Sequence, residues 1–582
     1  MPAGPDYDHR SEWVPSPRRV RVRFAGQTIA DSTAVMLLRQ HGFLPVYYFP
    51  ERHVRTRLLE PSPHVTFSPY KGTAQYFDIR AGQRVARASA WTYPAPRAGS
   101  PDTRGYYSFH WHGMDAWLEE DEIVSVHARD PYLRAETLSS SRRVVVRLRG
   151  EVVADTARPV LLLETGLVPR YYIPPADVAM EYFEPGPGYS MCPYKGTARY
   201  LDYRRRDTQV AGAAWYYPAP LRDVVKIASY VCFWNERADT TIEVDGAPVP
   251  HLGIRPSGRG GELLYPSRRF FMVPPPAAMR DARPGQLQHD FARPNGRAEG
   301  PPDDLIDMAV ESAGGRLHGR PDGPPRIGAP AETVAKPQSS LFFTFGRSPG
   351  LPSGEAGQPP AADYELRASL DPAATCVPAL RRVRALKAGV VLADSRDVII
   401  YAAPHRAAAY YFPAGDVRHD LLDASAGFSP ADPPPGLDLL RGRFTFKWNA
   451  IDTWLEEDDE VRGHPRMPYH RVDAVASGRH VVVRLAGTLL AESRRPVAVF
   501  ETGQPPRFYL PRADIAMHLL TPDGRRTESP YLGTAVHYAA RAGEATHSGV
   551  AWSYQEPIPE CPKIAGLICF DDSLVRVEEE IA

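Results

Sequence analysis

The chain has 582 residues, of which 43% are hydrophobic and 24% are charged, the usual balance of a folded globular protein and not of a wholly disordered one. Lys plus Arg and Asp plus Glu each number 69, so the formal net charge is zero, which argues against a nucleic-acid partner. The sequence shows neither a secretion signal nor an apolar segment of about 18 residues, so we expect a cytoplasmic protein with no membrane partner.

A hairpin pattern recurs four times along the chain. Its first copy has an apolar run at residues 19–24, then Gly26, then a second apolar run at residues 29–31. The other copies are centred on Gly150, Gly389 and Gly487. Alternating apolar residues around a glycine predict a β-hairpin, so we expect an all-β protein made of tandem small domains.

The four copies form a pair of pairs. Trp117 and Trp454 are 337 residues apart, and so are Glu164 and Glu501. A constant offset means that no insertion separates the two halves in this region. We predict repeats that pack within each pair and have these bounds: repeat 1 at 15–125, repeat 2 at 142–246, repeat 3 at 381–462 and repeat 4 at 479–580.

Repeat 3 is truncated. The offset between the halves is 363 at Val20 and Val383 but 337 further along, so repeat 3 lacks 26 residues. The loss removes the counterparts of a turn, a strand and the pair Trp91 and Tyr93. A small β-domain with an open edge is weakly stabilised, so we expect repeat 3 to serve as a packing partner of repeat 4 without a site of its own.

The segment between the pairs, residues 247–380, has a different composition. It holds 22 prolines in 134 residues, well above the average share of about 5%. Glycine and alanine are also frequent, and neither a strand nor a helix period persists. This composition predicts a long, mostly disordered linker.

Four short motifs in repeat 2 carry a resemblance to a known family. They are Glu164-Thr165-Gly166 and the stretches 171–174, 193–198 and 215–218. Their order resembles the domain of unknown function 427 family, over all of repeats 1, 2 and 4 and about three-quarters of repeat 3. The resemblance implies a small, strongly bent β-domain of the β-tent type. It also implies a nucleotidyltransferase label, with the biochemical activity unassigned.

The first candidate site is a polar set in repeat 2. Glu164 follows the apolar run 160–163, and Tyr172, Asp177 and Lys195 add a phenol, a second carboxylate and a cation. Burial of a carboxylate at the end of an apolar strand raises its pKa, and such a set can orient a polar ligand or move a proton. The alternative is that these groups cap turns.

Repeat 4 keeps only part of this set. It has Glu501, Tyr509 and Asp514, but Leu532 stands at the position of the lysine. Two aromatic pairs, Trp215 with Tyr217 and Trp552 with Tyr554, have a spacing of two. That spacing places both rings of a pair on one face of a strand, where they form either a core layer or a ligand platform.

The remaining candidates are a turn, a histidine pair and two acidic runs. The turn contains Tyr194 and Lys195 and either holds an anion through backbone N–H groups or is a structural turn. His110 and His112 are a weak metal candidate, and we favour solvated histidines. The acidic runs 119–122 and 456–460 are interpreted as solvated linker faces.

Taken together, these features favour a small-ligand-binding module seated in repeats 2 and 4. The alternatives are an enzyme of nucleotidyltransferase or other group-transfer type, and a structural scaffold. Neither a cofactor motif nor a Cys-x-x-Cys pair occurs, so no cofactor or metal is expected. The candidate ligand-binding residues are Glu164, Tyr172, Asp177, Tyr194, Lys195, Trp215, Tyr217, Glu501, Tyr509, Asp514, Trp552 and Tyr554.

Overall fold

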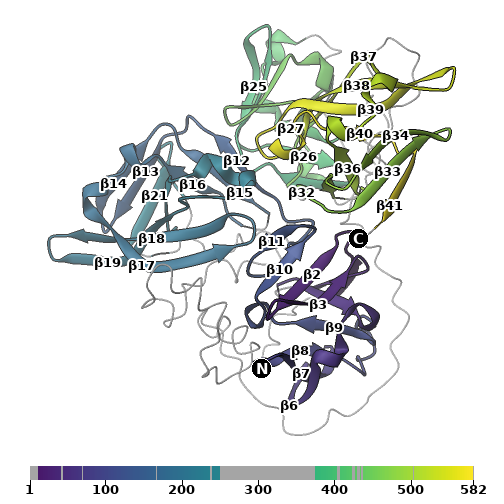
Figure 1. Cartoon of the computed structure of the whole chain (residues 1–582). Coiled ribbons are helices and arrows are strands. Elements are labelled where there is room, and N and C mark those ends of the chain that lie inside the picture. Colours follow the sequence, from purple (N-terminus) through teal and green to yellow (C-terminus); the bar gives the residue numbers. More distant parts are fainter. Residues whose placement is uncertain are drawn as a thin grey trace, which may run out of the picture.

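The computed structural model describes residues 11–249 and 374–580, apart from short gaps at 41–43, 69, 166, 236, 238, 403–406, 423–426, 429–432, 434–436, 469 and 503. The described chain consists of antiparallel sheets joined by short 3₁₀ turns, which confirms the all-β prediction. Figure 1 shows four β-units: repeat 1 in purple, repeat 2 in blue and teal, and repeats 3 and 4 in green to yellow. Most of the predicted linker, residues 250–373, lies outside the described residues.

Repeat 1 combines a long and a short sheet. The long sheet has the strand order β1-β4-β5-β9-β8-β7-β6, and the short one has the order β11-β10-β2-β3. The elements are β1 (Ser11–Pro15), β2 (Val20–Phe24), β3 (Gln27–Ser32), β4 (Met36–Gln40), β5 (Val46–Pro50), η1 (Glu51–His53), η2 (Thr56–Leu58), β6 (Leu59–Ser68), β7 (Gly72–Ala81), β8 (Arg84–Thr92), β9 (Tyr106–Phe109), η3 (Trp111–Gly113), β10 (Ala116–Glu119) and β11 (Glu122–Val124).

Repeat 2 repeats this topology. Its sheets have the orders β12-β15-β16-β20-β19-β18-β17 and β14-β13-β21-β22. The elements are β12 (Ala135–Ser139), β13 (Val144–Leu148), β14 (Glu151–Thr156), β15 (Val160–Glu164), β16 (Arg170–Ile173), η4 (Pro175–Asp177), η5 (Met180–Tyr182), β17 (Phe183–Cys192), β18 (Gly196–Arg205), β19 (Thr208–Tyr216), η6 (Arg222–Ile227), β20 (Val231–Phe233), β21 (Thr240–Val244) and β22 (Ala247–Pro248).

Repeat 4 has the same long sheet, in the order β32-β35-β36-β40-β39-β38-β37, and a short sheet β34-β33-β41. Its elements are β32 (Val472–Ala476), β33 (His480–Leu485), β34 (Thr488–Ser493), β35 (Val497–Glu501), β36 (Arg507–Leu510), η11 (Arg512–Asp514), η12 (Met517–Leu519), β37 (Leu520–Ser529), β38 (Gly533–Ala542), β39 (Ala545–Pro557), η13 (Pro562–Ile564), β40 (Ile568–Phe570) and β41 (Arg576–Glu580).

Repeat 3 has a reduced long sheet. Among its described residues the order is β23-β26-β27-β29-β28, and β28 pairs directly with β29 where repeat 1 places β7 and β8 between the corresponding strands. The short sheet, β25-β24-β30-β31, is complete. The elements are β23 (Thr375–Pro378), β24 (Val383–Lys387), β25 (Val390–Ser395), β26 (Ile399–Ala402), β27 (Ala409–Pro413), η7 (Ala414–Asp416), η8 (His419–Leu421), β28 (Gly427–Phe428), η9 (Asp438–Leu440), β29 (Arg443–Phe446), η10 (Trp448–Ala450), β30 (Thr453–Glu456) and β31 (Asp459–Val461).

The predicted hairpins are present in all four repeats. In the first, Ala25 and Gly26 connect β2 and β3, and both have positive φ angles, 49° and 74°. Positive φ at both central residues defines the tight turn whose twist matches that of the flanking strands. The glycine is needed because this backbone conformation strains other residues.

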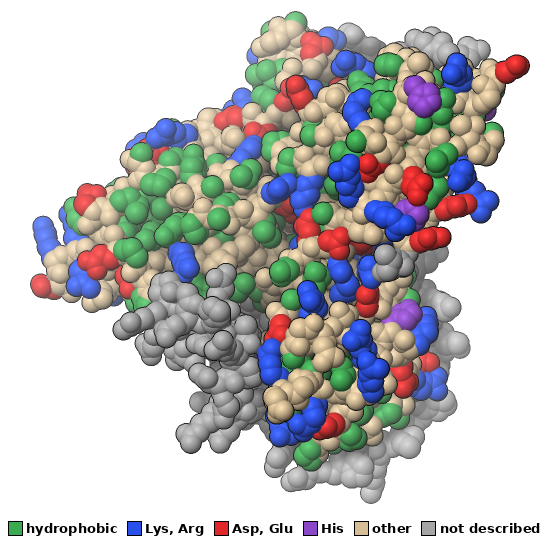
Figure 2. Space-filling view, in the orientation of Figure 1, with side chains coloured by type: hydrophobic (Ala, Val, Ile, Leu, Met, Phe, Trp, Pro, Cys, Tyr) green, Lys and Arg blue, Asp and Glu red, His purple; other side chains and the backbone are tan. Residues whose placement is uncertain are grey.

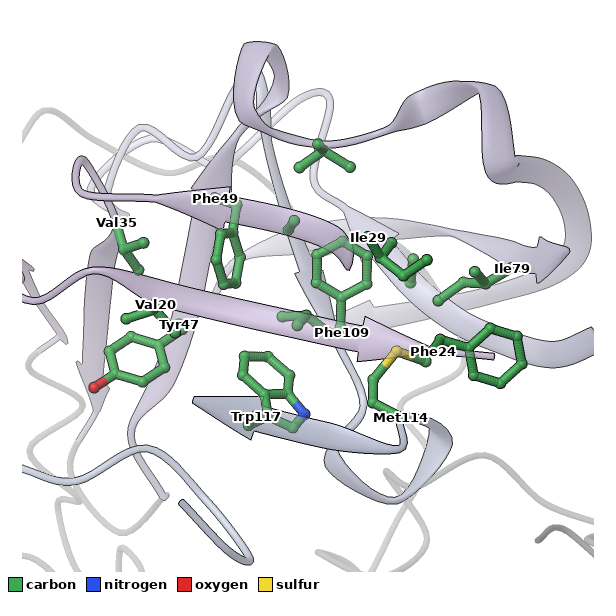
Figure 3. Close-up of a cluster of buried hydrophobic side chains, with 14 of the residues drawn as sticks. Val20, Phe24, Ile29, Val35, Tyr47, Phe49, Ile79, Phe109, Met114 and Trp117 are labelled. Carbon is green, nitrogen blue, oxygen red and sulfur yellow. The ribbon is translucent and has the colours of Figure 1, made fainter. Parts of the chain in front are cut away.

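Each repeat encloses its own hydrophobic core between the two sheets. In repeat 1, Val20 and Ile29 from the short sheet pack with Phe49 and Phe109 from the long sheet, and Trp117 closes the cluster (Figure 3). The five side chains are at most 3% exposed. The alternation of apolar residues along the strands therefore directs one face of each sheet into this core.

The strand that begins each repeat lies before the predicted boundary. Strands β1, β12, β23 and β32 are edge strands of the long sheets, yet the predicted repeats 2 and 4 start at residues 142 and 479. Likewise, β22, β23 and residues 379–380 fall within the segment that was predicted to be linker. These edge strands are short, and all except β23 contain a charged residue, so hydrophobic alternation does not reveal them.

The repeats do not pack only within each pair as predicted. Arg18 of repeat 1 contacts Asp473 of repeat 4, and Arg381 of repeat 3 contacts Glu136 of repeat 2. The hairpin of β10 and β11 in repeat 1 contacts the end of β32 in repeat 4, where the backbone N–H of Asp121 donates to the carbonyl oxygen of Ala476 at 3.1 Å. The two halves of the chain are thus joined by ion pairs, because a carboxylate on the first strand of repeat 2 or 4 contacts an arginine of the opposite half.

Candidate functional site

The polar set predicted in repeat 2 lies largely in one place, at the end of the long sheet. Glu164 ends β15, Tyr172 lies on β16 and Lys195 is in the turn between β17 and β18. Tyr172 is 1% exposed, Lys195 is 7% exposed and Glu164 is 6% exposed. All three side chains are therefore buried in the interior of repeat 2.

Lys195 and Glu164 form a buried ion pair. Nζ of Lys195 donates to Oε2 of Glu164. Burial by itself lowers the pKa of Lys195, but interactions with Cys192 and Glu164 outweigh it and raise the pKa above its ordinary value. The lysine is thus held as a cation that compensates the carboxylate, which is the usual requirement for burying a charge.

Repeat 4 satisfies the same carboxylate from a different element. Leu532 replaces the lysine, and Nε2 of His470 lies 2.8 Å from Oε1 of Glu501. The position equivalent to His470 in repeat 2 is Leu133, a buried core residue. Repeat 2 thus has Lys195 and Leu133 where repeat 4 has Leu532 and His470. In both repeats the buried carboxylate keeps one basic partner.

The predicted aromatic pairs belong to the core layer around these carboxylates. Nε1 of Trp215 donates to the hydroxyl of Tyr172 at 3.1 Å, and the rings of Tyr172 and Tyr217 are 6.4 Å apart. Burial raises the pKa of Tyr172 well above its ordinary value. In repeat 4, Trp552 donates to Tyr509 at 3.1 Å, and Tyr554 lies 6.3 Å from Tyr509.

Two predicted acids make their contacts elsewhere. Asp177 accepts hydrogen bonds from Thr156 at 2.7 Å and from Arg158 at 3.0 Å. Asp514 does the same with Ser493 and Arg495 in repeat 4. The contacts of Asp177 and Asp514 tie the 3₁₀ turn of each repeat to its hairpin, which gives both residues a structural function.

Tyr194, from the same predicted set, faces a neighbouring repeat. Its hydroxyl accepts a hydrogen bond from the backbone N–H of Asp130 at 2.7 Å, and the guanidinium of Arg471 lies 5.0 Å from its ring centre. Asp130 belongs to the segment that joins repeats 1 and 2, and Arg471 precedes β32 of repeat 4. Tyr194 therefore lies at a junction of three parts of the chain.

The first two residues of each acidic run are buried, so the interpretation as solvated faces was wrong for Glu119, Glu120, Glu456 and Glu457, whereas Asp121 and Glu460 are exposed. Glu119 and Glu120 are each 1% exposed. Glu119 accepts hydrogen bonds from Arg18 and from the hydroxyl of Tyr47, both at 2.8 Å. Glu120 accepts one from Arg479 of repeat 4 at 2.5 Å. Acidic runs are usually solvated, but here Arg18 of the same repeat neutralises Glu119 and Arg479 of repeat 4 neutralises Glu120.

The opposite interface carries the matching network. Arg381 contacts both Glu136 and Glu456, the latter at 2.9 Å, and the hydroxyl of Tyr410 donates to Glu456 at 2.6 Å. Glu457, the counterpart of Glu120, accepts a hydrogen bond from a serine of repeat 2. The interface between repeats 2 and 3 is thus related to that between repeats 1 and 4 by an approximate two-fold arrangement.

A cavity of about 280 Å³ lies between repeats 1 and 4. Repeat 1 supplies β1 residues, Leu37 and Tyr47, and repeat 4 supplies Phe500, Glu501 and the following loop. The segment between repeats 1 and 2 forms a third wall. Charged side chains on the lining are Arg18, Arg129, Arg471 and Glu501. On the face drawn in Figure 2, basic and acidic side chains are interspersed around this junction.

Sequence reasoning identified Glu501 but missed the arginines of the cavity. They come from three separate segments, and no shared motif surrounds them in the sequence. The detectable signal is their repetition, because Arg129 and Arg471 have counterparts, Arg466 and Arg134, at the offset of 337. Strand periodicity gives no such information, since these residues lie in connecting segments.

Histidines gather in repeat 1. The rings of His110 and His112 stack with centres 5.7 Å apart, and His64 packs against Tyr76 beside them. Burial, followed by the nearby His112 and His64, lowers the pKa of His110 well below its usual value. Over the described residues, no group of three or more His, Cys, Asp or Glu side chains has the geometry to hold a metal ion.

The predicted Tyr-Lys-Gly turn has a steric reason for its glycine. Gly196 has a φ of 96°, and a Cβ there would lie 3.3 Å from the carbonyl oxygen of Ala219. Gly72 in repeat 1 has a φ of 100° and a comparable contact with Ala95. These features support the structural interpretation of the turn.

Comparison with known proteins gives one family. The sequence profile of a family described as a domain of unknown function, DUF427, matches residues 12–120, 136–244 and 473–581, more than half of the chain. The profile does not extend over repeat 3. A search of curated proteins gives no match. In the described part of the chain, no helix is long and apolar enough to cross a membrane.

Proposed function

The chain belongs to the domain of unknown function 427 family, and we propose that it binds a small ligand in the cavity between repeats 1 and 4. The single observation that carries this proposal is the cavity itself, in which apolar and charged side chains face the same space. Ligand sites in proteins have this character: an apolar lining with a few convergent polar groups.

The size of the cavity suits a small molecule. Its volume of about 280 Å³ is close to the lower end, about 300 Å³, of pockets that enclose ligands. An apolar cavity of about 150 Å³ is large enough for benzene. The space therefore accommodates one ring with a polar substituent.

The counterpart positions in repeat 2 favour the repeat 4 side as the site. Where repeat 4 lines the cavity with Gln504, repeat 2 has Leu167. Glu164, the counterpart of Glu501, is enclosed with Lys195 in the core. We assign the repeat 2 set a stabilising function and the repeat 4 side a binding function.

A matched pair of variants tests this proposal. The thermal stability of the full chain is measured with a panel of nucleotides, amides and one-ring fragments. Gln504→Trp fills the cavity, and Leu167→Trp makes the same change at the equivalent position of repeat 2. We expect compounds that raise the Tm of the wild type and of Leu167→Trp but not of Gln504→Trp. A shift that persists in Gln504→Trp, or a panel without any shift, contradicts the proposal.

Repeat 3 completes the architecture in this proposal. We take it to be a reduced family copy of the same β-tent type, because its short sheet keeps the order of repeat 1 and its long sheet lacks only the strands corresponding to β7 and β8. Its buried Arg381 pairs with Glu456 of the same repeat and with Glu136 of repeat 2. Arg18 pairs in the same way with Glu119 of repeat 1 and Asp473 of repeat 4. Its function is then to support repeat 2.

A further inference from the structure

We infer that the ligand of this cavity is a small organic oxyanion, with a carboxylate or phosphate held by Arg129 and one ring or a similar apolar body. This inference rests on the proposed binding function and specifies its chemistry. Guanidinium groups bind carboxylate and phosphate through paired hydrogen bonds, and a water-poor site strengthens these bonds.

Two of the three arginines on the lining are already committed to protein carboxylates. Arg18 bonds Glu119 at 2.8 Å and Asp473 at 2.5 Å. Arg471 bonds Asp473 at 2.8 Å and also contacts Asp223. Both guanidiniums therefore stabilise the interface and have limited capacity for another anion.

Arg129 is bound differently. Its nearest carboxylate oxygens belong to Glu119 and Asp473, at 3.9 and 4.0 Å, beyond hydrogen-bond distance. Among the described residues, its Nε is buried without a hydrogen-bond partner. A buried donor left unbonded costs free energy, and an oxyanion beside the same guanidinium would relieve that cost by a small shift of the side chain.

The equivalent arginine at the other interface shows the contrast. Nε of Arg466 donates to Glu456 at 2.9 Å, although Nη2 of the same side chain is buried without a partner in the described part of the chain. Arg129 and Arg466 occupy matching positions with different bonding. The difference is that Arg466 has a carboxylate within hydrogen-bond distance, whereas the carboxylates nearest to Arg129 lie at 3.9 and 4.0 Å.

The rest of the lining suits an apolar body. Leu37 and Tyr47 are 3% and 2% exposed, and Phe500 is 6% exposed with Arg18 stacked on its ring at 4.6 Å. Prolines from three segments complete the wall. Glu501 belongs to the repeat 4 wall and bonds His470, whereas Arg129 belongs to the segment between repeats 1 and 2. An anion beside Arg129 is therefore expected to direct its ring towards the apolar lining.

Calorimetric titration of the full chain tests this assignment. The probes are benzoate, phenyl phosphate and the neutral isostere benzamide. We expect at least one anion to bind tenfold or more tightly than benzamide. Arg129→Gln should weaken that anion at least tenfold, Arg129→Lys should restore part of the affinity, and Arg466→Gln should leave it within about twofold of wild type.

The outcomes separate this inference from the proposed function. Tight binding of benzoate alone identifies a carboxylate, and tight binding of phenyl phosphate alone identifies a phosphate. Benzamide binding as tightly as both anions, and lost in Gln504→Trp, overturns the oxyanion assignment while the binding function stands. If all three probes fail to bind while the wider panel still raises the Tm of the wild type but not of Gln504→Trp, only the oxyanion inference is overturned. A panel without any shift overturns both. Equal weakening by Arg129→Gln and Arg466→Gln overturns the role of Arg129.

Discussion

The guanidinium of Arg18 lies 2.5 Å from the carboxylate of Asp473, although 455 residues separate them in the chain. Both side chains are buried, at 7% and 3% exposure. The same contact recurs between Arg381 and Glu136 at the other interface. Each half of the chain thus supplies an arginine to a carboxylate of the other half, and the two halves are arranged like the subunits of a symmetric dimer.

We therefore expect the halves to remain together when the chain between them is cut. A specific protease site is inserted within residues 250–373, and the folded protein is cleaved. Because the interfaces lie within residues 11–249 and 374–580, the fragments should co-elute at the size of the intact protein. Elution as two separate fragments at moderate salt would show that the linker, not the interface, holds the halves in contact.

Removing one carboxylate should weaken the whole assembly. Asp473→Asn leaves the buried Arg18 and Arg471 without their shared counter-charge, and breaking a buried pair in this way costs about 3–5 kcal/mol. The urea midpoint of unfolding should fall accordingly. As a control, Asp102→Asn removes an exposed carboxylate paired with Arg104 and should leave the midpoint in place. Equal midpoints for the two variants would contradict the structural importance of the network.

The exchange between repeats 2 and 4 predicts a rescue. Lys195→Leu leaves Glu164 buried without its cation and should lower the unfolding free energy by about 3–5 kcal/mol. Adding Leu133→His reproduces the arrangement of His470 and Glu501, and should recover much of the loss near neutral pH. Urea unfolding of the two single variants and the double variant measures the coupling. Additive losses in the double variant would show that the two arrangements are not equivalent.

Stability should fall as the pH drops from about 6.5 towards 4. Burial lowers the pKa of His127 and of His464 to about 4, so both are neutral in the folded protein over this range. The unfolded chain, with histidine pKa values near 6.5, binds more protons there, and unfolding becomes more favourable as protons are added. Asp473 and Glu136 add to this loss only at the acidic end of the window, because their lowered pKa values keep them ionised in the folded protein while the unfolded chain begins to protonate carboxylates below about pH 5.

Variants without these histidines check the assignment. His127→Gln together with His464→Gln should reduce the difference in urea midpoint between pH 7.5 and pH 5, since glutamine does not titrate. Other buried histidines, such as His537, retain part of the dependence. An unchanged difference in the double variant would show that His127 and His464 are not responsible for it.

The repeats were predictable from the sequence, whereas the contacts between them were not. The hairpin around Gly26 and the offset between Trp117 and Trp454 are local or periodic signals, and they locate the four β-units. The contact between Glu120 and Arg479, which are 359 residues apart, depends on how repeats 1 and 4 pack together. An acidic run has the same sequence whether solvent or arginines surround it in the folded protein. A fixed offset reveals copies, but not which copies touch.

The part of the candidate site that lies within one repeat was predictable, whereas the part formed between repeats was not. Glu164, Tyr172 and Lys195 were expected together, and Lys195 does contact Glu164 and interact with Tyr172. Glu164 ends β15, Tyr172 lies on the neighbouring strand β16, and Lys195 is in the turn that precedes β18 of the same sheet. Composition does not show that these side chains pack against one another and are buried. The cavity is formed by two repeats, so only the assembled chain brings Arg129 and Glu501 to the same lining.

A crystal structure of the full chain grown with benzoate or phenyl phosphate would locate the bound anion. We expect the ring in the cavity between repeats 1 and 4, with an oxyanion oxygen about 3 Å from the guanidinium of Arg129. A probe bound instead beside Glu164 in repeat 2, or only on the outer surface with water filling the cavity, would contradict this expectation.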